Sequence, residues 1–137
     1  MKICIIGSGG REHSLCYKLI QSPIISKVYC FPGNPGTENI AENVSVDINN
    51  FEEIYDKVLK HKIELLIVGP EVPLVNGIVD YFEQRNIKIF GPNKLASQLE
   101  GSKIFMKNLC DKFNIPSAKF KEIRNLKEAE EFFNVSN

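Results

Sequence analysis

Short apolar runs alternate with stretches of helical periodicity along most of this chain. Each run is rich in isoleucine, leucine or valine, and most of them end at glycine or proline, which is typical of buried β-strands. The pattern predicts five strands, at residues 2–6, 27–31, 44–46, 65–68 and 87–90.

Between these runs, apolar residues recur every three or four positions, the spacing that places them on one face of a helix. Asn50 followed by Glu53 is a capping-box pattern and predicts the start of one helix. The expected apolar face of that helix holds Phe51, Ile54, Val58 and Leu59. Other helices are expected at 11–21, 74–85, 94–100, 102–113 and 126–133, with one more strand at 118–122.

Apolar strands separated by helices of about 10–15 residues indicate βαβ units and a parallel sheet. We therefore predict an α/β fold with a doubly wound, mostly parallel sheet of about five strands. In such sheets the functional loops lie at the carboxyl ends of the strands. Residues 1–113 are expected to form this domain, and residues 114–137, which follow a proline-containing break, are expected to begin a different region.

Composition narrows the possible functions. Hydrophobic residues make up 43% of the chain, and 17 basic residues balance 17 acidic ones, so no charge excess indicates nucleic acid or a membrane surface as a partner. The longest apolar stretch, 63–72, contains Glu64, and no signal peptide is recognisable, so a cytoplasmic protein is expected. None of the four cysteines has zinc-ligand spacing, and they are expected to be reduced core residues rather than redox thiols.

The sharpest chemical signal is the loop after the first strand, Gly7-Ser8-Gly9-Gly10-Arg11-Glu12-His13. Glycines allow a tight turn, and a helix that starts there directs its positive end and unpaired amides at an anion. Arg11 adds a fork of donors suited to phosphate oxygens. The loop predicts a phosphate site, with a purely structural tight turn as the alternative.

A dinucleotide fingerprint would read G-x-G-x-x-G, followed about 20 residues later by an acidic residue. Here the sixth position is Glu12, and the second strand ends Cys30-Phe31-Pro32 without an acidic residue. These departures disfavour NAD and FAD, and no P-loop sequence occurs.

Two other strand-end loops carry polar groups. Asn34-Pro35-Gly36-Thr37 offers an amide and a hydroxyl on a stiff turn, and Glu71 follows the most apolar strand. A carboxylate at that place suits two vicinal ribose hydroxyls. It equally suits the positive end of the helix that follows it.

Five sequence blocks together resemble one family, phosphoribosylamine–glycine ligase, also called glycinamide ribonucleotide synthetase. The blocks are 7–13, 32–37, 69–74, 91–92 and 99–103, in order over the whole chain. The resemblance implies an enzyme of de novo purine synthesis that joins 5-phosphoribosylamine and glycine, with ATP and Mg²⁺ or Mn²⁺. It also implies the ATP-grasp superfamily, with a biotin-carboxylase-like N-terminal domain.

By this resemblance, the first loop holds the 5-phosphate and Glu71 holds the ribose hydroxyls. The implied substrate-binding residues are Gly9, Gly10, Arg11, Glu12, Asn34, Pro35, Gly36, Thr37 and Glu71. Lys103 matches the lysine that reaches the ATP phosphates, although from the sequence pattern alone it is equally a solvated helix lysine.

Members of the family are several hundred residues long, so we expect this chain to be an N-terminal part that is inactive alone. It is expected to bind 5-phosphoribosylamine and to pack against ATP-grasp domains absent from it. Two alternatives stay open: the first domain of another ATP-grasp ligase, and a non-catalytic nucleotide-sensing module.

Overall fold

The computed structural model describes residues 1–136, with side chains through residue 134. The chain forms two compact units, Met1–Gly101 and Ser102–Asn137. The expected domain boundary at residue 113 stays a prediction.

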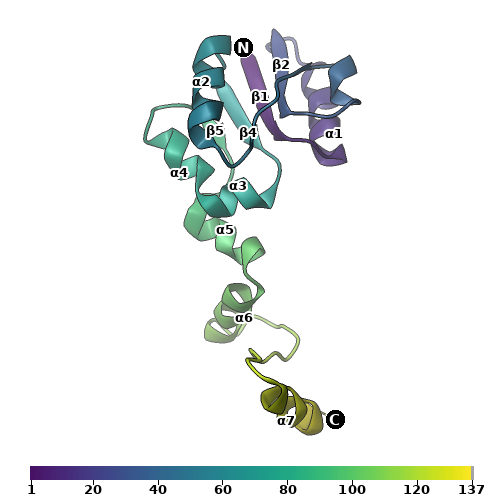
Figure 1. The fold of residues 1–137 in the computed structure, drawn as a ribbon, viewed down its shortest axis with the longest axis vertical. Helices are drawn as coiled ribbons and strands as arrows, with labels where there is room; N and C mark the ends of the chain where they lie inside the picture. The colour runs from purple at the N-terminus through teal and green to yellow at the C-terminus, as the bar shows by residue number, and fades with distance from the viewer. Residues whose placement is uncertain (137) are drawn as a thin grey trace. The chain divides into compact units, whose positions relative to one another are not determined.

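The first unit is built on five parallel strands in the order β3-β2-β1-β4-β5, which confirms the predicted α/β class and parallel sheet (Figure 1). The strands are β1 Lys2–Gly7, β2 Lys27–Pro32, β3 Glu42–Asn43, β4 Leu65–Val68 and β5 Ile89–Phe90. The helices are α1 Gly10–Leu19, the 3-10 helix η1 Thr37–Asn39, α2 Phe51–His61, α3 Glu71–Asn76, α4 Ile78–Glu83 and α5 Lys94–Gly101.

The central strand β1 brings three chain segments to one end of the sheet. Ile6 pairs with Phe31 of β2 and with Val68 of β4, and Gly7 pairs with Pro32. Since the strands are parallel, the loops after β1, β2 and β4 leave the sheet side by side. The topology therefore places the three loops that carry the predicted site residues at one edge of the sheet.

The two faces of the sheet pack against different helices. On one face Cys16 of α1 joins Ile5 and Cys30 in a buried cluster. On the other face α2, α3 and α4 enclose a larger core around the fully buried Phe31 and Phe82 (Figure 1). Each such buried side chain contributes about 1.5–3 kcal/mol of transfer free energy. The folded sheet is therefore a rigid base for the loops at its edge.

Three predictions for the first unit differ from the structure. The third strand occupies Glu42–Asn43 rather than 44–46, because pairing with β2 ends there while the two valines that follow pack against the core. The helix predicted at 74–85 starts earlier and is broken at Gly77, whose φ of 94° separates α3 from α4. Leu59, expected on the buried face of α2, is 52% exposed.

The second unit contains α6, Lys103–Lys112, and α7, Leu126–Ser136. The Ser102 hydroxyl caps α6 by accepting a hydrogen bond from the Phe105 amide, 3.2 Å away. The strand predicted at 118–122 is wrong, because this segment has no neighbouring strand within its described unit and is irregular.

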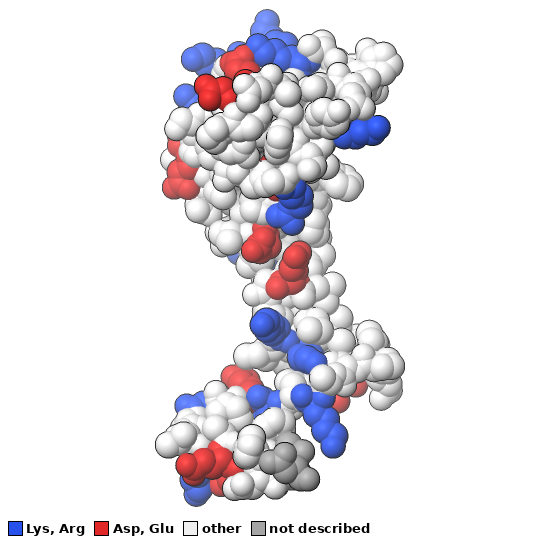
Figure 2. Space-filling view, turned by 90° about the vertical axis from the view of Figure 1, so that its right-hand side faces the viewer, with Lys and Arg blue, Asp and Glu red and all other residues white. Residues whose placement is uncertain are grey.

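Acidic and basic side chains are interspersed over the face shown in Figure 2, as the balanced composition predicts. Across residues 1–136, no helix has both the length and the apolar character needed to cross a membrane.

Candidate functional site

The loop after β1 turns sharply into α1. Gly7 has a φ of 130°, a conformation that favours glycine, and Gly9 is extended directly before the helix. The amides of Gly10 and Arg11 open α1 and have no acceptor among the described residues. Two free N–H groups at the positive end of a helix are suited to bind an anion.

Glu12 lies beneath this turn and is only 3% exposed. Its Oε2 accepts a hydrogen bond from the Gly9 amide at 2.6 Å, and its Oε1 accepts one from Arg11 Nε at 3.1 Å. A Cβ atom at Gly7 would lie 2.7 Å from Glu12 Cγ, and one at Gly69 would lie 2.0 Å from Oε1. The carboxylate therefore fills the space between the β1 and β4 loops.

Arg11 remains accessible, with a side chain that is 58% exposed. Only its Nε is bound, to Glu12, and its terminal nitrogens have no acceptor within the described part of the chain. Part of the guanidinium fork is therefore free for an anion beside the helix start.

Asn34 connects the loop after β2 to the glycine turn. Its Nδ2 donates to the carbonyl oxygens of Ser8 at 2.9 Å and Gly9 at 3.3 Å. Its Oδ1 accepts from the amides of Gly36 at 2.7 Å and Thr37 at 3.0 Å. The Asn34 side chain thus stabilises the turn after β2 and holds it against the glycine turn after β1.

Thr37 is fully buried, so its hydroxyl makes its hydrogen bonds inside the protein, within the loop. The hydroxyl donates to the Asn43 side-chain oxygen at 2.7 Å, and the Asn43 amide donates to the Asn34 carbonyl at 2.8 Å. Asn43 was missed by the sequence reasoning, because it follows no motif and lies nine residues after Asn34.

The loop after β4 lies directly against the first one. Pro70 Cδ would be 3.0 Å from a Cβ atom at Gly7, and Gly69 packs on Glu12. Glu71 then begins α3 with an exposed side chain. The expected neighbours on three loops therefore do come together at one edge of the sheet.

The predicted residues divide into two groups by exposure. Gly9, Gly10, Arg11, Pro35 and Glu71 are exposed. The remaining four are half-buried or buried: Glu12, Asn34, Gly36 and Thr37. A direct ligand contact stays a prediction for all nine, while the hydrogen bonds show that Glu12, Asn34 and Thr37 support the loops.

The phosphoribosylglycinamide synthetase N domain matches residues 1–100 of this chain. The chain belongs to this family. It is 46% identical over 132 residues to the phosphoribosylamine–glycine ligase of Caldanaerobacter subterraneus, covering 96% of this chain and 32% of that relative. It is likewise 46% identical over 134 residues to the ligase of the same name from Clostridium acetobutylicum, again covering 32% of that relative. The chain thus spans about a third of the length of these curated relatives.

Solved structures agree with this assignment. A phosphoribosylamine–glycine ligase from Thermotoga maritima matches with a TM-score of 0.71 and 26% identity, over 98% of this chain and 30% of that one. The biotin carboxylase domain of a single-chain bacterial carboxylase matches with a TM-score of 0.73 over 99% of this chain and 34% of that one. At 13% identity the second match shows the fold alone, which is the predicted biotin-carboxylase-like one.

Within the second unit, Lys103 is exposed at the start of α6. It borders a hollow of about 240 Å³ together with Lys107, Lys121, Ile104, Phe120 and Glu122. Lys107 donates to the Ser117 hydroxyl and to the Ala118 carbonyl, and an ATP contact of Lys103 stays a prediction. Among the residues that the structure describes, no cluster of three or more carboxylate, imidazole or thiol groups is arranged to hold a metal ion.

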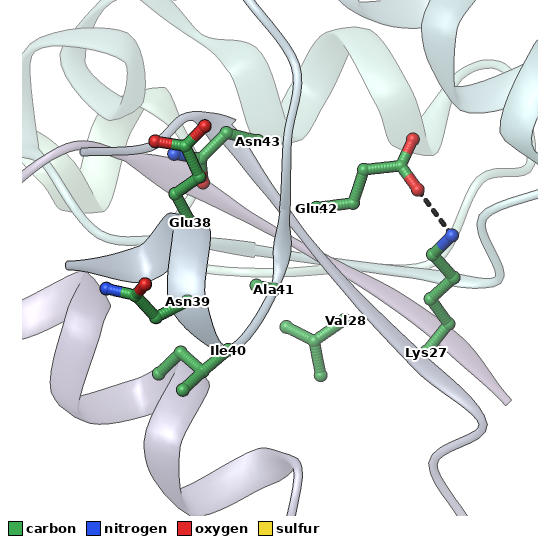
Figure 3. Close-up of a pocket in the computed structure, with 8 residues that line it drawn as sticks. All are labelled: Lys27, Val28, Glu38, Asn39, Ile40, Ala41, Glu42 and Asn43. Atoms are coloured by element: carbon green, nitrogen blue, oxygen red, sulfur yellow. Dashed lines mark ion pairs between the residues drawn. The ribbon is translucent and has the colours of Figure 1, made fainter. Parts of the chain in front are cut away.

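A larger hollow of about 510 Å³ lies along the edge of the sheet beside β3 (Figure 3). It is lined by Lys27, Val28, Glu38, Asn39, Ile40, Ala41, Glu42 and Asn43. Lys27 and Glu42 point toward one another and form an ion pair, and the hydrogen bond from Lys27 holds the pKa of Glu42 below its ordinary value. The one lysine of this hollow, Lys27, is therefore already paired, and Glu38 adds a second carboxylate, so the hollow is less suited to an anion than the amides at the start of α1.

Three of the four cysteines are buried, as predicted for core residues. Burial raises the pKa of Cys4, and a hydrogen bond to Cys30 raises the pKa of Cys16. The Cys30 thiol donates to the Gly7 carbonyl at 3.5 Å and so supports the turn from below. The hydrogen bond from Cys16 lowers the pKa of Cys30, and all three thiols pack as small buried side chains.

Proposed function

We propose that this chain is the substrate-binding part of an ATP-dependent ligase that joins 5-phosphoribosylamine and glycine in purine biosynthesis. The observation that supports it most directly is the pair of unpartnered amides at Gly10 and Arg11, beside a guanidinium that is partly free. Family membership supplies the substrate class, since the relatives are named for this reaction.

In this proposal the 5-phosphate binds at the start of α1, where backbone N–H groups and Arg11 donate to its oxygens. The ribose hydroxyls donate to the exposed carboxylate of Glu71 at the neighbouring strand end. Pro35 and Gly36 form one wall of the sugar site. The anomeric amine stays outside these contacts, where a second substrate can reach it.

The bond-forming step is assigned to a longer protein, because the relatives are about three times as long as this chain. In this proposal ATP binds to the lysines around Lys103 together with residues that this chain does not hold. The chain alone is expected to bind the ribose phosphate and to form no product.

Binding is tested by calorimetry with ribose 5-phosphate, which carries the same phosphate and sugar with a hydroxyl in place of the amine. Arg11→Ala is expected to weaken binding about 10- to 150-fold, because a charge-assisted hydrogen bond contributes about 1.5–3 kcal/mol. Arg124→Ala is the matched control, since Arg124 is also exposed and also pairs through Nε with a neighbouring glutamate, Glu122. Equal affinity of wild type and Arg11→Ala would contradict the proposed phosphate site.

Parallel titrations separate the alternatives. Ribose without the phosphate should bind at least about tenfold more weakly, since it lacks the charged group. Binding of NAD but not ribose 5-phosphate would favour a nucleotide-sensing module. Formation of glycinamide ribonucleotide by the chain alone from phosphoribosylamine, glycine and ATP would disprove the assignment of catalysis to a longer protein.

A further inference from the structure

A single peptide group in the glycine turn, the one that joins Ser8 to Gly9, is held at both of its polar ends. We propose that Glu12 and Asn34 are positioning residues that lock this peptide and thereby direct the next two amides outward to a single phosphate. The inference rests on the proposed function, because it assigns how the phosphate site of that function is shaped.

The N–H end of the peptide is held from below by Glu12. The distance from the Gly9 nitrogen to Glu12 Oε2 is 2.6 Å, and the carboxylate is almost fully enclosed. A short bond to a buried carboxylate is among the stronger hydrogen bonds in proteins. Gly9 has no Cβ to interfere, since a Cβ there would lie 2.9 Å from the same oxygen.

The C=O end of the peptide is held from the side by Asn34. Its Nδ2 donates to the Ser8 oxygen at 2.9 Å. The Asn34 side chain cannot rotate freely, because its Oδ1 accepts from the amides of both Gly36 and Thr37. Asn34 therefore connects the loop after β2 to the loop after β1 through a side chain of fixed orientation.

Locking this peptide has two consequences for a ligand. The Gly9 N–H is occupied by Glu12 and is withdrawn from ligand binding, which leaves the amides of Gly10 and Arg11. Preorganised donors bind more tightly, because no ordering is required when the ligand arrives.

The test compares two variants that each release one end. Asn34→Asp keeps the acceptor for Gly36 and Thr37 but removes the donor to Ser8, and Glu12→Met keeps the approximate length of the side chain but removes the acceptor for the Gly9 amide. Each is expected to weaken ribose 5-phosphate binding about tenfold, the effect of losing one well-placed hydrogen bond.

Matched controls are available elsewhere in the first unit. Glu64→Met removes a carboxylate that also accepts from a β1 amide, that of Lys2 at 2.7 Å, at the opposite end of the strand. Asn39→Asp adds the same charge as Asn34→Asp to the same loop, where the Asn39 side chain donates only to the Pro35 carbonyl. Both controls are expected to bind like the wild type.

Amide spectra distinguish positioning from general destabilisation. In the wild type, ribose 5-phosphate should shift the ¹H–¹⁵N signals of Gly10 and Arg11. In both release variants these shifts should be lost, at a temperature where circular dichroism shows full folding and the β1, β2 and β4 amides are unchanged.

The outcomes separate this inference from the proposed function. Wild-type affinity and wild-type Gly10 and Arg11 shifts in both folded release variants would overturn the inference alone. A wild-type chain that does not bind ribose 5-phosphate would overturn the proposed function and, with it, the inference that rests on it. If one release variant does not fold, the other still tests the peptide from its opposite end.

Discussion

Gly69 lies against the buried carboxylate of Glu12 and leaves no room for a side chain. A Cβ atom at position 69 would be 2.0 Å from Glu12 Oε1 and 2.6 Å from Cδ. The carboxylate cannot swing away without breaking its 2.6 Å hydrogen bond to the Gly9 amide. Gly69→Ala must therefore displace either the β4 loop or Glu12.

The size of the effect follows from two contributions. Overpacking a filled site costs about 1–3 kcal/mol. Losing a hydrogen bond to a charged group costs about 1.5–3 kcal/mol. Moving Glu12 away relieves the clash but breaks its hydrogen bond, so the two costs do not add in full. We therefore expect Gly69→Ala to lower the free energy of unfolding by about 3 kcal/mol. For a unit of this size that corresponds to roughly 10–20 °C in Tm.

The assay is urea and thermal unfolding followed by circular dichroism, with Gly10→Ala as control. Nothing lies within 4 Å of a Cβ at Gly10, so this change in the first turn of α1 should leave stability unchanged or raise it by up to about 1 kcal/mol. In a Glu12→Ala background, Gly69→Ala should cost about 1–3 kcal/mol less than in the wild type, since the clashing group is gone. An equal cost in both backgrounds would refute the steric reasoning.

Two further predictions concern the core. Ile54→Ala should lower the free energy of unfolding by about 2–5 kcal/mol, because Ile54 is fully buried, whereas Leu59→Ala on the exposed side of the same helix should change it by about 0.5 kcal/mol or less. In a thiol-reagent titration Cys110 should be the one cysteine of the native chain that reacts, and all four should react in denaturant. Raising the pH from 7 to 9 should not make Cys4 of the native chain reactive, because burial raises the pKa of its thiol; rapid labelling of Cys4 in the native chain would count against the packing described here.

The parallel sheet could be predicted from the sequence because its strands are continuous apolar runs bounded by glycine and proline. The break inside the third helical segment could not, since Leu74 and Ile78 are both buried and the apolar stripe continues across Gly77. A glycine within a helical pattern is tolerated in many helices, so the pattern does not reveal its positive φ. The exposure of Leu59 could not be predicted either, because helical spacing does not determine how wide the buried face of a helix is.

At the site, the sequence identified which loops meet but not which way their polar side chains face. The family resemblance implied that Glu12 and Thr37 both contact the substrate. The structure turns both inward, where Glu12 binds the Gly9 amide and Thr37 binds Asn43. Both bonds are local, since Glu12 lies three residues after Gly9 and Thr37 lies six residues before Asn43. A polar residue in a loop does not by itself reveal whether its side chain turns to the backbone or to solvent.

The position of Glu12 also shows why backbone geometry rather than excess positive charge governs the proposed phosphate site. A buried carboxylate beneath an anion-binding turn would repel the anion unless it were paired. Arg11 Nε, 3.1 Å away, supplies that pairing, so the two side chains nearly cancel in charge. The remaining attraction comes from the amides at the start of α1 and from the free end of the guanidinium. The orientation of those amides depends on the Ser8–Gly9 peptide, so a chain with equal numbers of acidic and basic residues can still select a phosphate.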